Sequence, residues 1–297
     1  MTMYFIPTND SVRIAARRYQ PATPPRAAVI IGSAMGVPQE FYAAFAEWLA
    51  TQGFAAFTFD YRGTGASRPA GSLRGFKANI DDWAQLDCAA LIDHVSAAHP
   101  GLPICWIGHS VGAQILGMIP NHTRLTAMLS VAAGSGYHRY NATPVRYYVR
   151  ALWYAIAPLS LLAAGYFPGK KLRVIGDLPH GVMTQWRKWC LSPDYLGSEG
   201  RELREQLARV RVPITAWSMR DDELMTLAGT QALFSLYSGT QLEIVRMDPA
   251  CYGVNRIGHF GLFRSQSRDV LWPLVSAWLT KQVDGRQALV VTAVTHT

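Results

Sequence analysis

Short apolar runs alternate along this chain with longer segments whose apolar residues recur at helical spacing. "AAVII" (27–31) and "FAAFTF" (54–59) are typical of buried strands. Between them, a stretch that starts at Pro38 and closes at Gly53 carries apolar residues at i, i+4, i+7 and i+8 from Phe41. Strands that alternate with helices favour a mostly parallel sheet with helices on both faces. We therefore predict an α/β fold whose chemistry gathers at the carboxyl ends of the strands.

The same alternation is found on both sides of one irregular stretch. Further strands are predicted at 103–107, 125–134, 213–218 and 241–247, and further helices at 79–100, 111–119, 222–237 and 269–283. The pattern lapses in an aromatic-rich stretch between them. We interpret residues 1–136 and 208–285 as the core, 137–207 as an inserted helical cap, and 286–297 as a C-terminal tail.

Residues 151–169 form an uncharged apolar run that raises the question of a membrane. A spanning helix needs about 20 such residues. Pro158 interrupts this run and Pro168 lies near its end, and proline breaks or kinks a helix. We interpret the run as a buried or lid-like helix pair, with peripheral membrane contact as the less favoured alternative.

Composition excludes several other classes of protein. The net charge is +8, but the basic residues are scattered and no nucleic-acid-binding motif accompanies them, so we expect no nucleic-acid partner. The four cysteines lie far apart without a CxxC pair, which argues against a zinc site. The N-terminus has no basic region followed by a long apolar one. A cytoplasmic protein with reduced thiols is the resulting expectation.

"GHSVG", residues 108–112, follows directly on a predicted strand. A tight strand-to-helix turn brings together the residues two before and two after the serine, so glycine is needed at Gly108 and Gly112. The turn would hold the Ser110 hydroxyl at the sheet edge and aim the Val111 N–H at an oxyanion. Ser110 is the predicted nucleophile, and an idle serine in a tight turn is the alternative.

A serine hydroxyl needs a general base and an acid that orients this base. His259 lies between the last predicted strand and the last predicted helix, at the same sheet edge as Ser110. His109 would point away from the nucleophile along the turn, and we keep it as a candidate for substrate contact. Asp221 and Asp222 both follow the strand at 213–218, and either could be the acid.

Together these segments resemble the α/β-hydrolase superfamily. The resemblance rests on an oxyanion loop "IIGSAMGVPQEFY", a D-x-R-G-x-G-x-S loop "FDYRGTGAS", the elbow "GHSVG", an acid loop "SMRDDEL" and a histidine loop "GHF". The chain is most similar to the serine aminopeptidase-like and monoglyceride-lipase-like set, which includes many bacterial hydrolases. The resemblance implies an acyl-enzyme mechanism with a Ser-Asp-His triad and without a metal or organic cofactor.

The oxyanion loop departs from the family pattern, which often has His-Gly here. Aligning the segment 32–36 by the helix that follows puts the donor N–H on Met35, with Ala34 second. In the "FDYRGTGAS" loop, we expect Asp60 and Arg62 to brace the turn rather than to touch substrate.

The acid loop departs from the family pattern G-x-x-D as well. Ser218 replaces the glycine, and counting from it gives Asp221. Counting back from Leu224, the apolar residue usually two past the acid, gives Asp222. We slightly favour Asp222.

The resemblance implies a small-molecule acyl substrate, and the cap offers a clue to its class. Aromatic cap residues that include Trp153, Tyr154 and Trp186 favour an apolar pocket and an ester with an apolar acyl group, unless they form the cap's own core. An amidase or aminopeptidase, a thioesterase that acts on an acidic carrier, and a non-catalytic binding protein are the alternatives. An aminopeptidase would call for an acidic cluster in the cap, where the acids are Asp177, Asp194, Glu199, Glu202 and Glu205.

Overall fold

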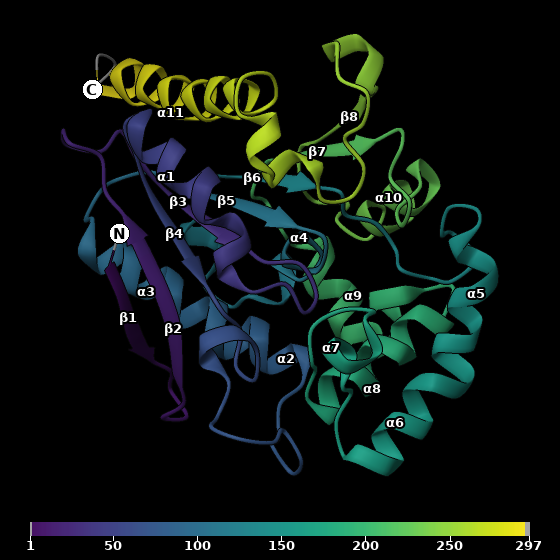
Figure 1. Ribbon diagram of the computed structural model, residues 1–297. Coiled ribbons are helices and arrows are strands. Elements are labelled where there is room, and N and C mark those ends of the chain that lie inside the picture. The colour runs from purple at the N-terminus through teal and green to yellow at the C-terminus, as the bar shows by residue number, and fades with distance from the viewer. Residues whose placement is uncertain (1, 295–297) are drawn as a thin grey trace.

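Residues 2–294, the part of the chain that the computed structural model describes, contain one eight-stranded sheet (Figure 1). In chain order the strands are β1 Thr2–Pro7, β2 Arg13–Tyr19, β3 Ala27–Gly32, β4 Phe54–Phe59, β5 Ile104–His109, β6 Ala127–Val131, β7 Ile214–Met219 and β8 Leu242–Met247. Their order in the sheet is β1-β2-β4-β3-β5-β6-β7-β8. The first two strands run antiparallel to their neighbours, and all later pairs are parallel. The predicted mostly parallel sheet is confirmed.

Helices cover both faces of this sheet. On one face lie α1 (Ala43–Thr51) and α11 (Trp272–Val294), whose apolar residues form one core cluster with alternate strand residues. On the other lie α2 (Ile80–Asp82), α3 (Ala89–Ala98), α4 (Val111–Gln114) and α10 (Leu227–Phe234). A π-helical stretch, Trp83–Cys88, joins α2 to α3. The fold is therefore a three-layer arrangement of the kind predicted.

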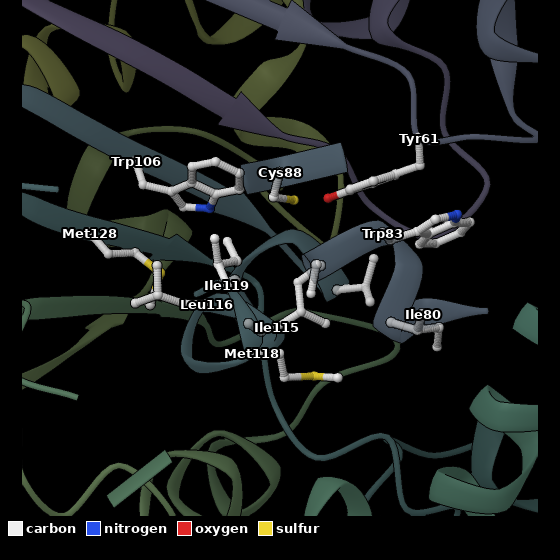
Figure 2. Packing of buried hydrophobic residues seen from close by; sticks show 14 of the residues in the cluster. Tyr61, Ile80, Trp83, Cys88, Trp106, Ile115, Leu116, Met118, Ile119 and Met128 are labelled. Carbon is white, nitrogen blue, oxygen red and sulfur yellow. The ribbon is translucent and has the colours of Figure 1, made fainter. Parts of the chain in front are cut away.

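A second core cluster fills the other face of the sheet, and Figure 2 shows part of it. It includes Val111 and Ala113, which directly follow the predicted nucleophile. Trp106 reaches from β5 into this cluster, and its indole N–H donates to the carbonyl of Gly112, 2.8 Å away. Tyr61 and Trp83 stack with ring centroids 4.5 Å apart (Figure 2). These large buried rings fix the segments that follow β4 and β5.

The sheet order reverses between β3 and β5. From β3 the chain crosses to β4 on one side and later to β5 on the other. Such a switch point leaves a crevice outside the carboxyl ends of the two strands, where α/β proteins bind ligands. The loop 33–38 and the turn at Ser110 both start at this edge.

Three helices differ in extent from the predictions. The helix expected at 111–119 ends early, because the Tyr237 hydroxyl donates to the carbonyl of Gln114 and accepts the N–H of Gly117, taking the place of helical bonds. The helix expected from residue 222 starts later, because Thr226 caps it by accepting the N–H of Gly229. α11 extends through most of the tail expected at 286–297, whose last three residues lie outside the described part.

Between β6 and β7, the region interpreted as a cap folds into five α-helices within the described residues. They are α5 Val145–Ala151, α6 Ala157–Ala164, α7 Gly169–Leu172, α8 His180–Leu191 and α9 Arg201–Ala208, with a π-helical stretch Leu152–Ile156 between the first two. In Figure 1, α5 and α6 run along the outer edge of this region. None of the helices in the described part is both long and apolar enough to span a membrane.

Candidate functional site

The predicted nucleophile occupies a strained backbone position. Ser110 has φ 52° and ψ −118°, between the end of β5 and the start of α4. Residues other than glycine rarely adopt such values, which cost about 1–3 kcal/mol and persist only when the surroundings impose them. The Ser110 N–H donates to the carbonyl of Val131 on neighbouring β6, 3.0 Å away, and this bond helps to hold the turn.

Both glycines of "GHSVG" are required, but their steric partners differ from those we expected. A Cβ on Gly108 would lie 2.5 Å from Cα of Ala113, within the following helix. A Cβ on Gly112 would lie 2.3 Å from the carbonyl oxygen of Gly32, at the end of β3. The glycines therefore do not avoid each other. They let the turn pack against the helix and against the start of the oxyanion loop.

The predicted base forms a buried pair with one of the two candidate acids. His259 Nδ1 lies 2.9 Å from Oδ2 and 3.2 Å from Oδ1 of Asp222. Oδ1 of Asp222 also accepts the N–H groups of Leu224 and Met225. The carboxylate has no proton to donate, so Nδ1 of His259 is the donor and its Nε2 is left with a lone pair. Within the described residues, no hydrogen bond joins Nε2 to Ser110.

Asp221 has a different task. Its two carboxylate oxygens accept the N–H groups of Ile257 and Gly258, at 2.8 Å and 3.0 Å. Glu223 accepts the N–H of His259 itself at 3.2 Å. The residues on either side of Asp222 therefore hold the backbone of the histidine loop.

Of the three N–H groups that we predicted as oxyanion donors, one already has an acceptor within the protein and two have none. The N–H of Ala34 already donates to the Tyr42 hydroxyl, 2.9 Å away, so Ala34 does not fit its predicted role. In the described part of the chain, the N–H groups of Met35 and Val111 have no acceptor. These two follow the ends of the adjacent strands β3 and β5, as an oxyanion hole requires.

His109 does not contact the site as a substrate-binding residue would, so that prediction is wrong. Its side chain is fully buried, with Nε2 2.9 Å from the carbonyl of His259 and Nδ1 2.8 Å from the Tyr42 hydroxyl. A carbonyl only accepts, so Nε2 carries the proton and Tyr42 donates to Nδ1. Burial, and next the neighbouring His259, holds the pKa of His109 well below its usual value. A neutral His109 therefore completes a chain of bonds from Ala34 to His259.

Tyr42 is a site residue that we did not predict, although the sequence contains a signal for it. Tyr42 lies on the buried side of the segment that follows the oxyanion loop. A buried tyrosine hydroxyl normally finds a polar partner. A tyrosine that closely follows the predicted oxyanion loop could therefore have been expected to bond to that loop.

The loop after β4 braces the site, as we expected for Asp60 and Arg62. Asp60 accepts the backbone N–H of Gln39 at 2.9 Å and that of Ala66 at 3.0 Å, and so ties this loop to the segment after the oxyanion loop. Burial raises the pKa of Asp60. Arg62 donates to buried Asp87 and, on its outer side, to Asp10 in the β1–β2 turn.

The aromatic residues predicted to bind substrate take two different positions. Trp153 is 2% exposed and packs edge-to-face on Trp186, with ring centroids 4.8 Å apart. Tyr154 is 58% exposed and faces solvent. Trp153 therefore belongs to the core cluster that the insert shares with the sheet, and Trp186 packs against it. The predicted substrate contact of Tyr154 does not fit its exposed position.

The predicted nucleophile and base have little exposed surface. Ser110 is 7% exposed and His259 2% exposed. A Cβ on Gly36 of the oxyanion loop would meet the backbone N of Gly176 at 2.9 Å, and one on Gly63 would meet Pro179 at 2.5 Å. The segment 176–179 therefore lies directly against the loops that carry the site.

The acidic residues of the insert do not form a free cluster. Four of the five are in ion pairs within the described residues: Asp177 with Arg68, Asp194 with Arg204, Glu199 with Lys188, and Glu205 with Arg201 and Arg209. The described side chains also contain no group of three His, Cys, Asp or Glu that could hold a metal ion.

Comparison with known proteins gives one family. The model of the family described as serine aminopeptidase, S33, matches residues 23–172, which is just over half of the chain. The matched region includes the oxyanion loop and Ser110 and ends before the acid and the histidine. A monoglyceride lipase homolog from monkeypox virus is 31% identical over 124 residues, 40% of this chain. The match spans 43% of the length of that relative.

Solved structures share the fold at low sequence identity. A carboxyl esterase from Bacillus coagulans, solved in complex with glycerol, has a TM-score of 0.65 at 13% identity, and 95% of this chain and 98% of that chain are covered. An esterase from Pyrococcus furiosus has a TM-score of 0.59 at 14% identity, with 95% and 92% covered. The esterase domain of a Rhodothermus marinus protein has a TM-score of 0.56 at 17% identity, with 95% of this chain and 98% of that chain covered. The motifs, the sheet and the family match agree, and the chain belongs to the serine aminopeptidase S33 family of the α/β-hydrolase superfamily.

Proposed function

We propose that this protein is a serine hydrolase that cleaves a carboxylic ester with an apolar acyl group. The observation that carries the proposal is the buried His259–Asp222 pair, whose histidine loop is bonded to His109, the residue before the strained Ser110. A buried carboxylate next to an imidazole fixes its tautomer and stabilises the imidazolium that forms during proton transfer. The names of the monoglyceride lipase homolog and of the esterases with the same fold support ester chemistry.

In the proposed reaction, Nε2 of His259 accepts the proton of Ser110 as the hydroxyl oxygen attacks the acyl carbon. The same nitrogen then donates this proton to the leaving alkoxide, and Ser110 keeps the acyl group as an ester. Water, deprotonated by His259, releases the acid in the second half of the reaction. Asp222 stays ionised throughout and holds the ring through Nδ1.

Met35 and Val111 are the proposed oxyanion donors. Their N–H groups belong to loops that are fixed by different contacts, Val111 by the elbow and Met35 by the Ala34–Tyr42 bond next to it. Donors that are already oriented need no reorganisation when the negative charge develops on the substrate oxygen. The low exposure of both residues would strengthen this interaction, because little water competes for it.

Two features favour an apolar ester over a peptide. Met35 and Val111 belong to the same buried apolar cluster as insert residues such as Leu178, Val182 and Met183, so the surroundings of the serine are apolar. Most acidic side chains of the insert are neutralised by ion pairs, which leaves little to hold the free amino group of a peptide. Because Ser110 is nearly sealed, we propose that the segment 176–179 moves to admit the substrate.

The test is hydrolysis of p-nitrophenyl esters from acetyl to long chain by the wild type and Ser110→Ala, with fluorophosphonate labelling alongside. Loss of the nucleophile in a triad costs on the order of 10⁶ in turnover. Ser135→Ala is a matched control, since Ser135 is also buried and also follows a strand at this edge. We expect activity and labelling to vanish in Ser110→Ala and to persist in the control.

Two outcomes would contradict parts of the proposal. If folded wild-type protein neither labels nor hydrolyses any ester, the hydrolase assignment fails and a binding role takes its place. If acetyl esters turn over far faster than medium-chain esters, the enzyme is a hydrolase but the apolar acyl pocket is wrong.

A further inference from the structure

A surface groove of about 560 Å³ lies where the insert leaves the core. One wall is the loop that follows β6, and the other is the first helix of the insert, α5. Its lining residues are Tyr137, His138, Arg139, Arg146, Tyr147 and Arg150. The groove thus presents three guanidinium groups and no carboxylate.

The positive charge of this groove has no carboxylate partner in the described part of the chain. Arg139, Arg146 and Arg150 take part in none of its ion pairs, and no Asp or Glu occurs between residues 137 and 176. Arg146 and Arg150 are one helical turn apart on α5, a spacing at which like charges repel. Burial, and next the charges of Arg150 and Arg139, lowers the pKa of His138. These like charges repel one another, and an anionic ligand bound between them would relieve the repulsion.

The groove is held in shape by bonds to neighbouring elements. The N–H of His138 donates to the carbonyl of Cys190 at 2.9 Å, and the Thr226 hydroxyl donates to the carbonyl of Tyr140 at 2.7 Å. On the other wall, the Arg146 guanidinium lies 4.9 Å from the ring centroid of Tyr147 and donates to its hydroxyl at 3.1 Å. The loop wall is therefore anchored by its backbone, and on the helix wall Arg146 is held against Tyr147.

We propose that this groove binds the phosphate group of an anionic ligand. Guanidinium groups match phosphate oxygens with paired, charge-assisted hydrogen bonds, and the charge of three of them exceeds that of a doubly charged phosphate. The proposal goes beyond ester hydrolysis and does not depend on it. The phosphate can come from a lipid headgroup or from a soluble molecule, and these two sources predict different binding behaviour.

The surroundings of the groove favour the lipid source. Among the described residues twelve large hydrophobic side chains are exposed, and eight of them lie between residues 147 and 174. Tyr147 and Tyr148, at the groove, are 64% and 60% exposed. An amphiphile could place its phosphate between the arginines and its apolar part against these side chains.

Binding can be measured without any assay of catalysis. Titration calorimetry with inorganic phosphate and co-sedimentation with vesicles, either pure phosphatidylcholine or mixed with phosphatidylglycerol, would be run on three proteins. These are the wild type, the groove variant Arg139→Gln/Arg146→Gln/Arg150→Gln, and a control Lys170→Gln/Lys171→Gln/Arg173→Gln. The control removes three positive charges from the same region but outside the groove. Melting temperatures would verify that all three are folded.

We expect the wild type to bind phosphate or phosphatidylglycerol vesicles, and the groove variant to lose on the order of 100-fold in affinity, since each lost cation weakens binding roughly fivefold. The control should lose less than about fivefold. Much tighter binding to phosphatidylglycerol vesicles than to free phosphate would support the lipid source, and equal or weaker binding the soluble source. Equal losses in the two variants would refute the groove and leave only diffuse charge. Absence of binding to both probes by the folded wild type would also overturn the proposal.

Discussion

Asp221 and Asp222 are adjacent and carry the same side chain, but their contacts differ. We therefore expect Asp222→Asn to reduce mainly activity and Asp221→Asn to reduce mainly stability. In Asp222, Oδ1 accepts two backbone N–H groups, at 2.7 Å and 2.8 Å, while Oδ2 faces Nδ1 of His259. In Asp222→Asn, the amide oxygen must keep the two backbone bonds, so the NH₂ group takes the place of Oδ2. It then donates to Nδ1, and the ring proton moves to Nε2.

A histidine protonated at Nε2 cannot accept the proton of Ser110. We therefore expect kcat of Asp222→Asn to fall on the order of 10⁴-fold, about 5.5 kcal/mol of transition-state stabilisation. In Asp221→Asn, by contrast, the amide oxygen keeps one of the two bonds to the backbone of the histidine loop. The amide NH₂ then faces the other backbone N–H, and neither of these two donors has an acceptor. An unpaired buried N–H costs about 1–3 kcal/mol of stability, so we expect a lower melting temperature and at most about a tenfold loss in kcat.

The assay is kcat on the best p-nitrophenyl ester for both variants, with Ser110→Ala as the inactive baseline and thermal unfolding followed by circular dichroism. The comparison is sharp because the two variants change the same atoms at neighbouring positions. If Asp221→Asn loses as much activity as Asp222→Asn while both remain folded, the assignment of Asp222 as the acid is wrong.

Two further variants test the supports of the site. Tyr42→Phe removes the hydroxyl between Ala34 and His109. It should cost about 1–3 kcal/mol of stability, and we expect about a tenfold loss in kcat with little change in KM; an unchanged kcat would show that the oxyanion loop does not need this bond. In Asp10, the hydrogen bond from Arg62 lowers the carboxyl pKa from 3.8 to about 2. The Asp10–Arg62 ion pair therefore contributes its full stabilisation to the folded protein above about pH 4, and this contribution is lost as the pH falls toward 2. The unfolding free energy of Asp10→Asn should lie below wild type at pH 6 and converge with it near pH 2, and a gap that persists at pH 2 would contradict the ion pair.

The sheet and the identity of the main motif residues were accessible from the sequence because each has a local cause. Apolar runs such as 54–59 become strands buried on both faces, and a parallel sheet requires helices between them. Gly108 and Gly112 mark a turn that no other residue could complete. Such features depend on neighbours along the chain, which a sequence displays directly.

The extents of helices and the partners of side chains depend on contacts between distant segments. The helix after Ser110 ends early because of Tyr237, more than 100 residues later in the sequence. Choosing between Asp221 and Asp222 required the position of the histidine loop, since both follow the same strand. His109 shows the same limit, because its burial against Tyr42 cannot be inferred from "GHSVG" alone.

Hydrogen bonds from residues around the site hold the oxyanion loop and the histidine loop in fixed positions, although these loops lie near opposite ends of the chain. Tyr42 fixes the oxyanion loop and, through neutral His109, the carbonyl of His259, while Asp221 and Glu223 hold the N–H groups of the same histidine loop. The histidine backbone is therefore fixed on both its acceptor and its donor sides. A strained nucleophile is useful only if its partners do not relax away from it. The bonds of Tyr42, His109, Asp221 and Glu223 meet that requirement for the oxyanion loop and the histidine loop.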